Sequence, residues 1–111
     1  MDERRKNLRI IARIPCDLLI APTGRHFSGV TKNISFGGVE FEASESLVRP
    51  GSGVTSGTAA ILTFQMRRMG ILQELKFPCR LRFIAANTAG IEFTVSYPTP
   101  EQRLALQAMM E

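Results

Sequence analysis

The chain has 111 residues and a formal net charge of +4, with 44% hydrophobic and 22% charged residues. These values are typical of one ordinary globular domain, and they exclude both a disordered chain and a catalytic domain joined to a regulatory one. Its apolar runs are too short to span a membrane, and the charged N-terminus has no signal-peptide pattern, so we expect a cytoplasmic protein.

Positive charge is concentrated at the start of the chain. Residues 1–8 are basic and have no periodic pattern, which predicts a flexible arm that becomes ordered against a ligand or partner. Arg5 and Arg9 are four residues apart, so their side chains share one side of either a strand or a helix. The guanidinium group is a rigid fork of donors that fits a phosphate or the O6/N7 edge of guanine. The pair is therefore a candidate clamp for a guanine nucleotide.

Apolar residues alternate with polar ones along most of the remaining chain, which predicts short strands. Pro15 marks a bulge or an edge within the first stretch, and Pro78 is a candidate break in a later one. Residues 44–58 have the composition of a loop. About six antiparallel strands with frequent turns favour a small closed β-barrel within a single domain over residues 9–111. The predicted strands cover residues 10–20, 27–34, 39–43, 60–66, 72–84 and 90–95.

A polar turn is predicted between the second and third of these strands. Its sequence is Asn33-Ile34-Ser35-Phe36-Gly37-Gly38. Asn and Ser side chains stabilise turns by bonding their own backbone, and glycine accepts a positive φ and leaves room for close approach of a ligand. We therefore expect Gly38 to keep the approach to the turn open for a ligand.

One helix is predicted, at the C-terminal end. Thr99 is a suitable N-cap, Pro100 suits the first helical position, and Gln102 completes a capping box with Thr99. Leu106 and Met109 then share one face, so the helix is expected to dock on the sheet.

Neither a metal site nor an enzyme is predicted. Cys16 and Cys79 are far apart in sequence and lie among apolar residues, which indicates free thiols in the core. His26 is the single histidine, and no zinc-ligand or nucleophile–base spacing includes it. Glu40 and Glu42 alternate with apolar residues, which indicates the solvated face of a strand and not an acid–base pair.

Three motifs in this order resemble the PilZ domain family. They are Arg5-x-x-x-Arg9, Asn33-x-Ser35-x-x-Gly38 and the Gly-Ile-Glu-Phe strand at residues 90–93. The resemblance covers nearly the whole chain. It implies a six-stranded antiparallel β-barrel with a C-terminal α-helix, which binds the bacterial second messenger cyclic di-GMP without a further cofactor. It also implies signalling to an unidentified downstream protein that controls motility, biofilm or exopolysaccharide.

The resemblance also implies a role for each motif residue. Arg5 and Arg9 would hold guanine edges and phosphates, and the Asn33 turn would hydrogen-bond a guanine base. Many members have Asp at the position of Asn33, so a neutral amide replaces a carboxylate here. Arg4 resembles a residue of members that bind an intercalated dimer of the ligand. The implied ligand-binding residues are Arg4, Arg5, Arg9, Asn33, Ser35, Gly37 and Gly38.

The alternative from another class is a small basic barrel that binds RNA or single-stranded DNA. Such a protein needs aromatic residues interleaved with basic ones on an exposed strand. Phe41, Phe64, Phe77 and Phe93 instead fall among apolar neighbours and are predicted to be core, which disfavours nucleic acid as the ligand. A family-like barrel that acts purely through protein contacts is disfavoured as well. Members of that kind usually lack the arginines, whereas this chain has them.

Overall fold

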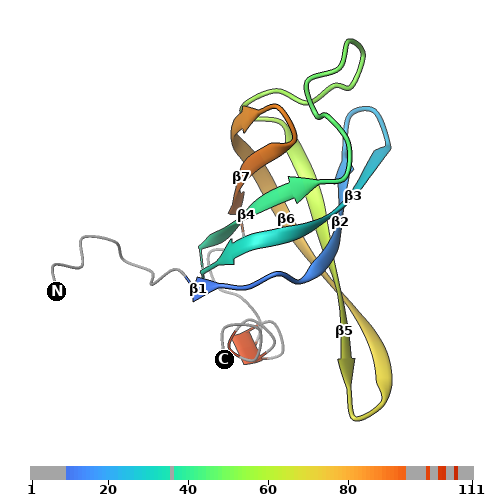
Figure 1. Ribbon diagram of the computed structural model, residues 1–111, viewed down its shortest axis with the longest axis vertical. Helices are drawn as coiled ribbons and strands as arrows, with labels where there is room; N and C mark the ends of the chain where they lie inside the picture. Colours follow the sequence, from blue (N-terminus) through green and yellow to red (C-terminus); the bar gives the residue numbers. More distant parts are fainter. Residues whose placement is uncertain (1–9, 36, 95–99, 101–102, 105–106, 108–111) are drawn as a thin grey trace, which may run out of the picture.

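The protein is described by a computed structural model, which covers residues 10–35, 37–94, 100, 103, 104 and 107 (Figure 1). Its strands are all antiparallel to their neighbours. They are β1 (Ile10–Ile11), β2 (Pro15–Ile20), β3 (Arg25–Ile34), β4 (Gly38–Ala43), β5 (Ala59–Arg68), β6 (Ile71–Ala85) and β7 (Thr88–Phe93).

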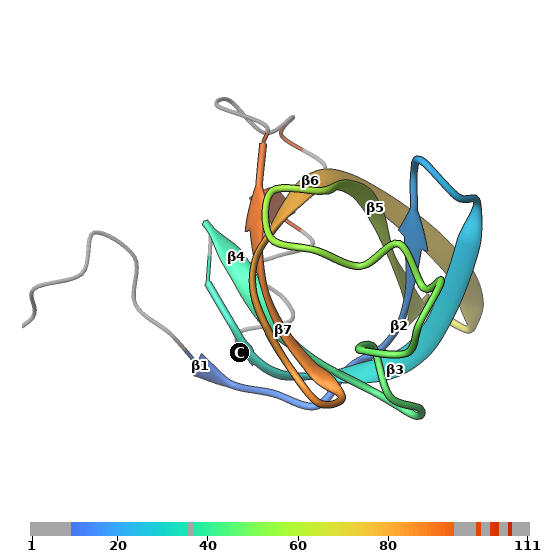
Figure 2. The same ribbon diagram turned by 90° about the horizontal axis from the view of Figure 1, so that it is seen from above.

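Six of these strands close into a barrel. The ring runs from β2 through β3, β4, β7, β6 and β5 back to β2, and Figure 2 shows it from above. β1 lies outside the ring and pairs with β3. The prediction of a mainly β, six-stranded antiparallel barrel is confirmed, with β1 as an additional strand.

The interior of the barrel is filled by the apolar residues of the alternating strands. Phe64 and Phe77 are fully buried and meet edge to face, with ring centroids 5.5 Å apart. Phe93 is partly buried and stacks on Phe77 at 4.8 Å. Phe41 is fully buried as well. The prediction that these four rings belong to the core is confirmed, and Cys16 and Cys79 are free, buried thiols as expected.

The first predicted strand is interrupted between β1 and β2. Ile14 and Ala12 lie in this interruption, and the buried side chain of Thr31 on β3 bridges it. The Thr31 hydroxyl accepts a hydrogen bond from the Ile14 amide at 2.9 Å and donates one to the Ala12 carbonyl. The predicted irregularity at Pro15 is therefore an interruption just before it, and Thr31 satisfies backbone groups that the interruption leaves without strand partners.

Pro78 does not break the fifth predicted strand. It lies within β6 opposite Ile61 of β5. Its carbonyl accepts a hydrogen bond from Thr94 at 3.0 Å, on the side of β6 that faces away from β5. A residue in a strand directs its N and its C=O to the same side, so the missing N–H of proline removes no bond to β5.

The predicted C-terminal helix falls mostly on residues outside the described part of the chain. Pro100, Arg103, Leu104 and Gln107 are described there with helical backbone, but no helix is among the elements of the described residues. The helix therefore stays a prediction. Within the described residues, no helix is long and apolar enough to cross a membrane.

Candidate functional site

A β-bulge at the end of β3 determines which way Asn33 faces. Thr31 pairs with Phe41 of β4, whereas Asn33 pairs with Glu40, so Lys32 is an extra residue on β3. Thr31 is buried inside the barrel, and strict alternation would have directed Asn33 inward as well. The bulge shifts the alternation by one residue, which places Asn33 on the outer face.

The Asn33 side chain is held by the carboxylate opposite it. Its Nδ2 donates a hydrogen bond to Oε1 of Glu40 at 2.9 Å. The Glu40 side chain is 25% exposed, and its Oε2 lies 3.6 Å from Nζ of Lys32. Glu40 therefore lies on the outer face, as expected, and in addition it orients the first residue of the Asn-x-Ser-x-x-Gly motif. The sequence did not reveal this role, because alternation indicates only that Glu40 faces outward.

The Ser35 hydroxyl closes the turn between β3 and β4. Its Oγ accepts hydrogen bonds from the amides of Gly37 and Gly38, each at 3.2 Å. The Ser35 amide donates to the Gly38 carbonyl at 2.9 Å, and Ser35 is buried. Ser35 therefore stabilises the turn as predicted. Asn33, in contrast, lies within β3 and not in the turn.

The close approach of a neighbouring strand requires a glycine at position 38. A Cβ atom on Gly38 would lie 2.0 Å from the carbonyl oxygen of Ile91 in β7. Gly38 is not among the residues with positive φ. Its backbone therefore does not use the left-handed conformation that glycine permits. The space beside Gly38 is occupied by backbone of this chain, so what the glycine permits there is the pairing of β4 with β7.

A second β-bulge turns Phe83 outward on β6. Leu81 pairs with Ile91 and Phe83 with Gly90, so Arg82 is the extra residue. Phe83 is 51% exposed, and its ring covers Gly90: a Cβ there would lie 2.2 Å from Cε1 of Phe83. The pairing of an outward aromatic ring with a bare glycine was missed in the sequence. The alternation of the buried residues Phe77, Cys79 and Leu81 would direct Phe83 inward, so only the bulge, which sequence does not reveal, turns it outward.

The two bulges lie at either end of one row of residues that runs around the outside of the barrel, across four neighbouring strands. The register runs from Asn33 to Glu40, then to Gly90, and then to Phe83. Ile11 of β1 extends the row beyond Asn33 and is 87% exposed. At about 4.8 Å per strand, the row from Asn33 to Phe83 follows roughly 14 Å of the curved outer surface of the barrel. The row thus has apolar ends and a polar, hydrogen-bonding centre, and we call it the outer row.

Ile10, the residue that follows the arginine motif, lies beside this row. Arg4, Arg5 and Arg9 themselves lie outside the described residues. The first described residue, Ile10, pairs with Ile34, which lies between the two polar residues of the Asn-x-Ser motif. The residue that follows the arginine motif is therefore adjacent to the Asn-x-Ser motif, although the two are more than twenty residues apart in sequence.

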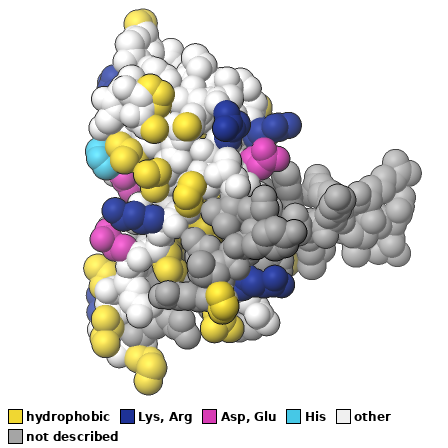
Figure 3. Space-filling view, turned by 180° about the vertical axis from the view of Figure 1, so that it is seen from behind, with side chains coloured by type: hydrophobic (Ala, Val, Ile, Leu, Met, Phe, Trp, Pro, Cys, Tyr) yellow, Lys and Arg dark blue, Asp and Glu magenta, His cyan; other side chains and the backbone are white. Residues whose placement is uncertain are grey.

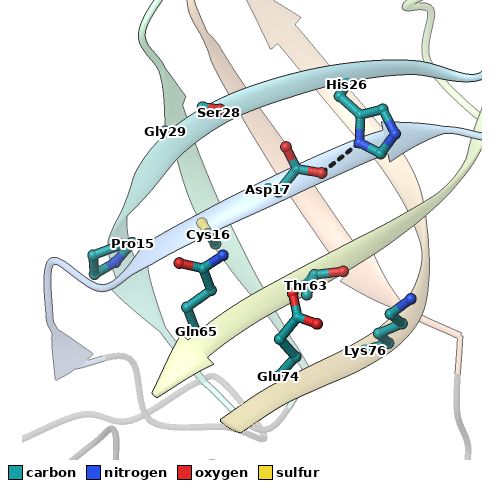
Figure 4. Close-up of a pocket in the computed structure, with 10 residues that line it drawn as sticks. All are labelled: Pro15, Cys16, Asp17, His26, Ser28, Gly29, Thr63, Gln65, Glu74 and Lys76. Atoms are coloured by element: carbon teal, nitrogen blue, oxygen red, sulfur yellow. Dashed lines mark hydrogen bonds and ion pairs between the residues drawn. The ribbon is translucent and has the colours of Figure 1, made fainter. Parts of the chain in front are cut away.

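A groove of about 440 Å³ lies elsewhere, on the outer side of β2, β3, β5 and β6 (Figure 4). Asp17 and His26, which line it, are hydrogen-bonded, with Oδ2 and Nδ1 2.7 Å apart. Burial, with the nearby charge of Asp17 adding to it, raises the pKa of the Cys16 thiol to about 12. That thiol is therefore a poor nucleophile. The groove contains no residue of the two motifs, and Glu74 and Lys76 give it charges of both signs.

Solved structures similar to this chain share its fold. The PilZ domain of YcgR from Escherichia coli with c-di-GMP has a TM-score of 0.74 at 16% identity, covering 96% of this chain and 92% of that one. The PilZ domain of CeSA from a cellulose-synthesising bacterium has a TM-score of 0.65 at 20% identity, covering 93% of this chain and 94% of that one. The inhibitor of motility MotI from Bacillus subtilis has a TM-score of 0.71 at 17% identity, covering 97% of this chain and 50% of that one. This chain therefore spans half the length of MotI.

No curated protein sequence matches the chain. The sequence profile of the PilZ domain does match it, over residues 3–111, which includes the arginine motif, the Asn33 turn and every strand of the barrel. The chain therefore belongs to the PilZ domain family.

Proposed function

We propose that this chain is a cytoplasmic receptor for cyclic di-GMP that signals by binding and not by catalysis. The observation that carries the proposal is the outer row, in which one bulge turns Asn33 outward beside the residue that follows the arginine motif and a second bulge turns Phe83 outward at the other end. Bulges disrupt the strand ladder and are found preferentially next to functional sites, where they re-aim side chains.

The chemistry of the outer row fits a guanine base. Glu40 is a carboxylate, and guanine presents two donors, N1–H and the N2 amino group, on one edge. Asn33 contributes its amide in an orientation that Glu40 maintains. Phe83 offers an exposed ring on which a base stacks. In this arrangement Ser35 acts by holding the turn, because its hydroxyl is already bonded to the turn amides.

The arginine motif would bind the phosphates and the other base edges. Arg5 and Arg9 each offer a bidentate fork, and the charge of arginine is independent of any working pH. We expect residues 1–8 to become ordered over the bound ligand, which would change the surface that a downstream protein meets. The relatives are consistent with this role, since one is a PilZ domain with c-di-GMP and another is an inhibitor of motility.

A titration of the labelled protein with cyclic di-GMP, followed by amide NMR and calorimetry, tests the proposal. Arg5→Ala and Arg9→Ala each remove charge-assisted hydrogen bonds worth about 1.5–3 kcal/mol, so binding should weaken at least about tenfold. Arg49→Ala is the matched control, because Arg49 is an exposed arginine in the loop before β5. If both motif variants titrate like the Arg49 variant, the arginine clamp is wrong.

The same titration tests the mode of binding. We propose that Arg4 supports an intercalated dimer of cyclic di-GMP, since a third guanidinium offers extra charge for two ligands with four phosphates. Calorimetry should then give two ligands per chain, and Arg4→Ala should reduce this to one. One ligand per wild-type chain contradicts the dimer. Displacement of the ligand by generic oligonucleotides would instead favour the nucleic-acid alternative.

A further inference from the structure

The hairpin of β5 and β6 extends beyond the barrel. β5 pairs with β2 up to Phe64, and β6 pairs with β7 from Cys79 onward. From Gln65 to Arg68 and from Ile71 to Phe77, the two strands pair with each other and with no other described strand. The hairpin therefore projects away from the ring, as Figure 1 shows. We call residues 67–72 the hairpin tip.

The hairpin tip exposes apolar side chains on all sides. Met69 is 99% exposed, Ile71 64% and Leu72 58%. Ile71 and Leu72 are consecutive in a strand, so they face opposite sides of the hairpin, and Met69 lies in the turn at its end. Hydrophobic side chains accordingly lie at the lower end of the molecule in Figure 3, where Figure 1 places this turn.

Met69 is an unfavourable residue for the turn in which it lies. Met69 and Gly70 connect the strands as a two-residue loop, with φ values of 51° and 79°. Two positive φ values favour Asn-Gly, Asp-Gly or Gly-Gly, and a residue with a larger side chain is conformationally costly there. The chain thus places a fully exposed apolar side chain where turn formation favours a small polar one. Such a local conflict is expected at functional positions.

Basic residues flank this apolar end. Arg67 pairs with Leu72, and Arg68 pairs with Ile71, so the register places an arginine beside each aliphatic residue. There is no acidic residue between positions 65 and 73, and Glu74 is the first that follows. The tip therefore carries apolar residues and positive charge at the same level of the hairpin.

We propose that the hairpin tip inserts into the headgroup region of an anionic phospholipid membrane. A protein groove would cover one face of a hairpin, whereas here apolar groups occupy both faces and the end. Insertion end-on buries all three, and the long side chain of Arg67 can then reach back to the lipid phosphates. Because the tip projects from the ring, it reaches a planar surface without contact between that surface and the barrel. The contact is independent of cyclic di-GMP binding.

A single-tryptophan reporter tests insertion directly, because the chain has no tryptophan. The fluorescence emission of Leu72→Trp should shift to the blue on vesicles of phosphatidylcholine mixed with phosphatidylglycerol, and not on phosphatidylcholine vesicles. Val48→Trp is the matched control, since Val48 is 57% exposed in the loop before β5 and should show no shift. No shift for Leu72→Trp on the anionic vesicles overturns the proposal.

Vesicle sedimentation of the full chain provides the second test. The double variant Met69→Asn, Leu72→Thr leaves the net charge unchanged, and asparagine suits the turn, so the fold is retained. Its partition coefficient on anionic vesicles should fall at least about tenfold, whereas Val48→Thr should partition like the wild type. Equal partition of the double variant and the wild type assigns binding to the basic arm and overturns the proposal. A wild-type dimer that the double variant abolishes, without vesicles, identifies a second copy as the occupant and also overturns it.

Discussion

The amide of Asn33 donates its hydrogen bond to Glu40, the residue directly opposite it across the pair of β3 and β4. The two side chains meet because Lys32 bulges out of β3 and turns its neighbour outward. Asn33 is thus positioned by a strand irregularity and by a carboxylate, and not by the turn that follows. The first two predictions concern the outer row that begins with this contact.

Glu40→Ala should weaken cyclic di-GMP binding about tenfold. The substitution removes the acceptor that orients Asn33 and the carboxylate proposed to face guanine, and a hydrogen bond to a charged group is worth about 1.5–3 kcal/mol before its partial exposure reduces it. Calorimetry measures the change. Glu42→Ala is the control, because Glu42 lies on the same face of β4 but pairs with Arg13 at 2.9 Å. Equal dissociation constants for the two variants would exclude a specific role for Glu40.

Phe83→Leu should also weaken binding about tenfold, because it removes the ring while it leaves an apolar side chain above Gly90. Stacking of a base on an aromatic ring is worth about 1–3 kcal/mol. Phe83→Tyr retains a ring and should bind like the wild type. Fluorescence competition with a labelled ligand measures both variants, and a leucine variant with wild-type affinity would show that the ring covers Gly90 without contacting ligand.

Gly38→Ala should lower the free energy of unfolding by more than about 2 kcal/mol, because the new Cβ overlaps the Ile91 carbonyl and forces β4 away from β7. Gly51→Ala is the comparison. Gly51 has a φ of +77°, and no atom lies within 4 Å of an added Cβ. The alanine substitution there therefore costs only the strain of the left-handed conformation, about 1–2 kcal/mol. Urea denaturation measures both. A smaller loss at Gly38 than at Gly51 would mean that the two strands separate easily.

Stability should fall at high pH because of the two core thiols. Burial raises the pKa of Cys16 and of Cys79 from the ordinary value of 9.0 to about 12. Each thiol has a higher pKa in the folded state than in the unfolded state. Its contribution to the free energy of unfolding is therefore complete below pH 9.0 and is lost as the pH rises toward 12. Urea denaturation between about pH 8 and pH 11 should show the decline. The variant Cys16→Ala, Cys79→Ala should show a flatter profile, and identical slopes would contradict this assignment.

The parts of the fold that depend on simple alternation could be predicted from the sequence. Phe27, Phe41 and Phe64 alternate with polar neighbours, and each fills the barrel interior. The barrel, its strand content and the interruption beside Pro15 follow from such local signals. Pro78 was ambiguous because its effect depends on which side of β6 its nitrogen faces, and sequence does not define that side.

The site was predictable in its residues but not in its geometry. Asn33 and Ser35 were identified by their motif, yet their separate roles depend on a bulge and on a buried turn. Gly38 was assigned to ligand approach, because the proximity of Ile91 arises from the pairing of distant strands. Phe83 and Ile11 were missed for the same reason, since the outer row exists only when four strands from both halves of the chain are side by side.

Closure of the barrel has a consequence for how the protein folds. The ring is completed by pairs such as Leu18 with Leu62 and Phe41 with Ala89, which are remote in sequence. Local hairpins form quickly, but the loop-closure entropy of these remote pairs must be overcome before the core can form, so we expect slow, all-or-none folding. Gly38 touches Ile91 only across one of these late pairings. The contact between this turn and β7 is therefore completed late in folding, so the proposed site has its full geometry only when the whole domain is assembled.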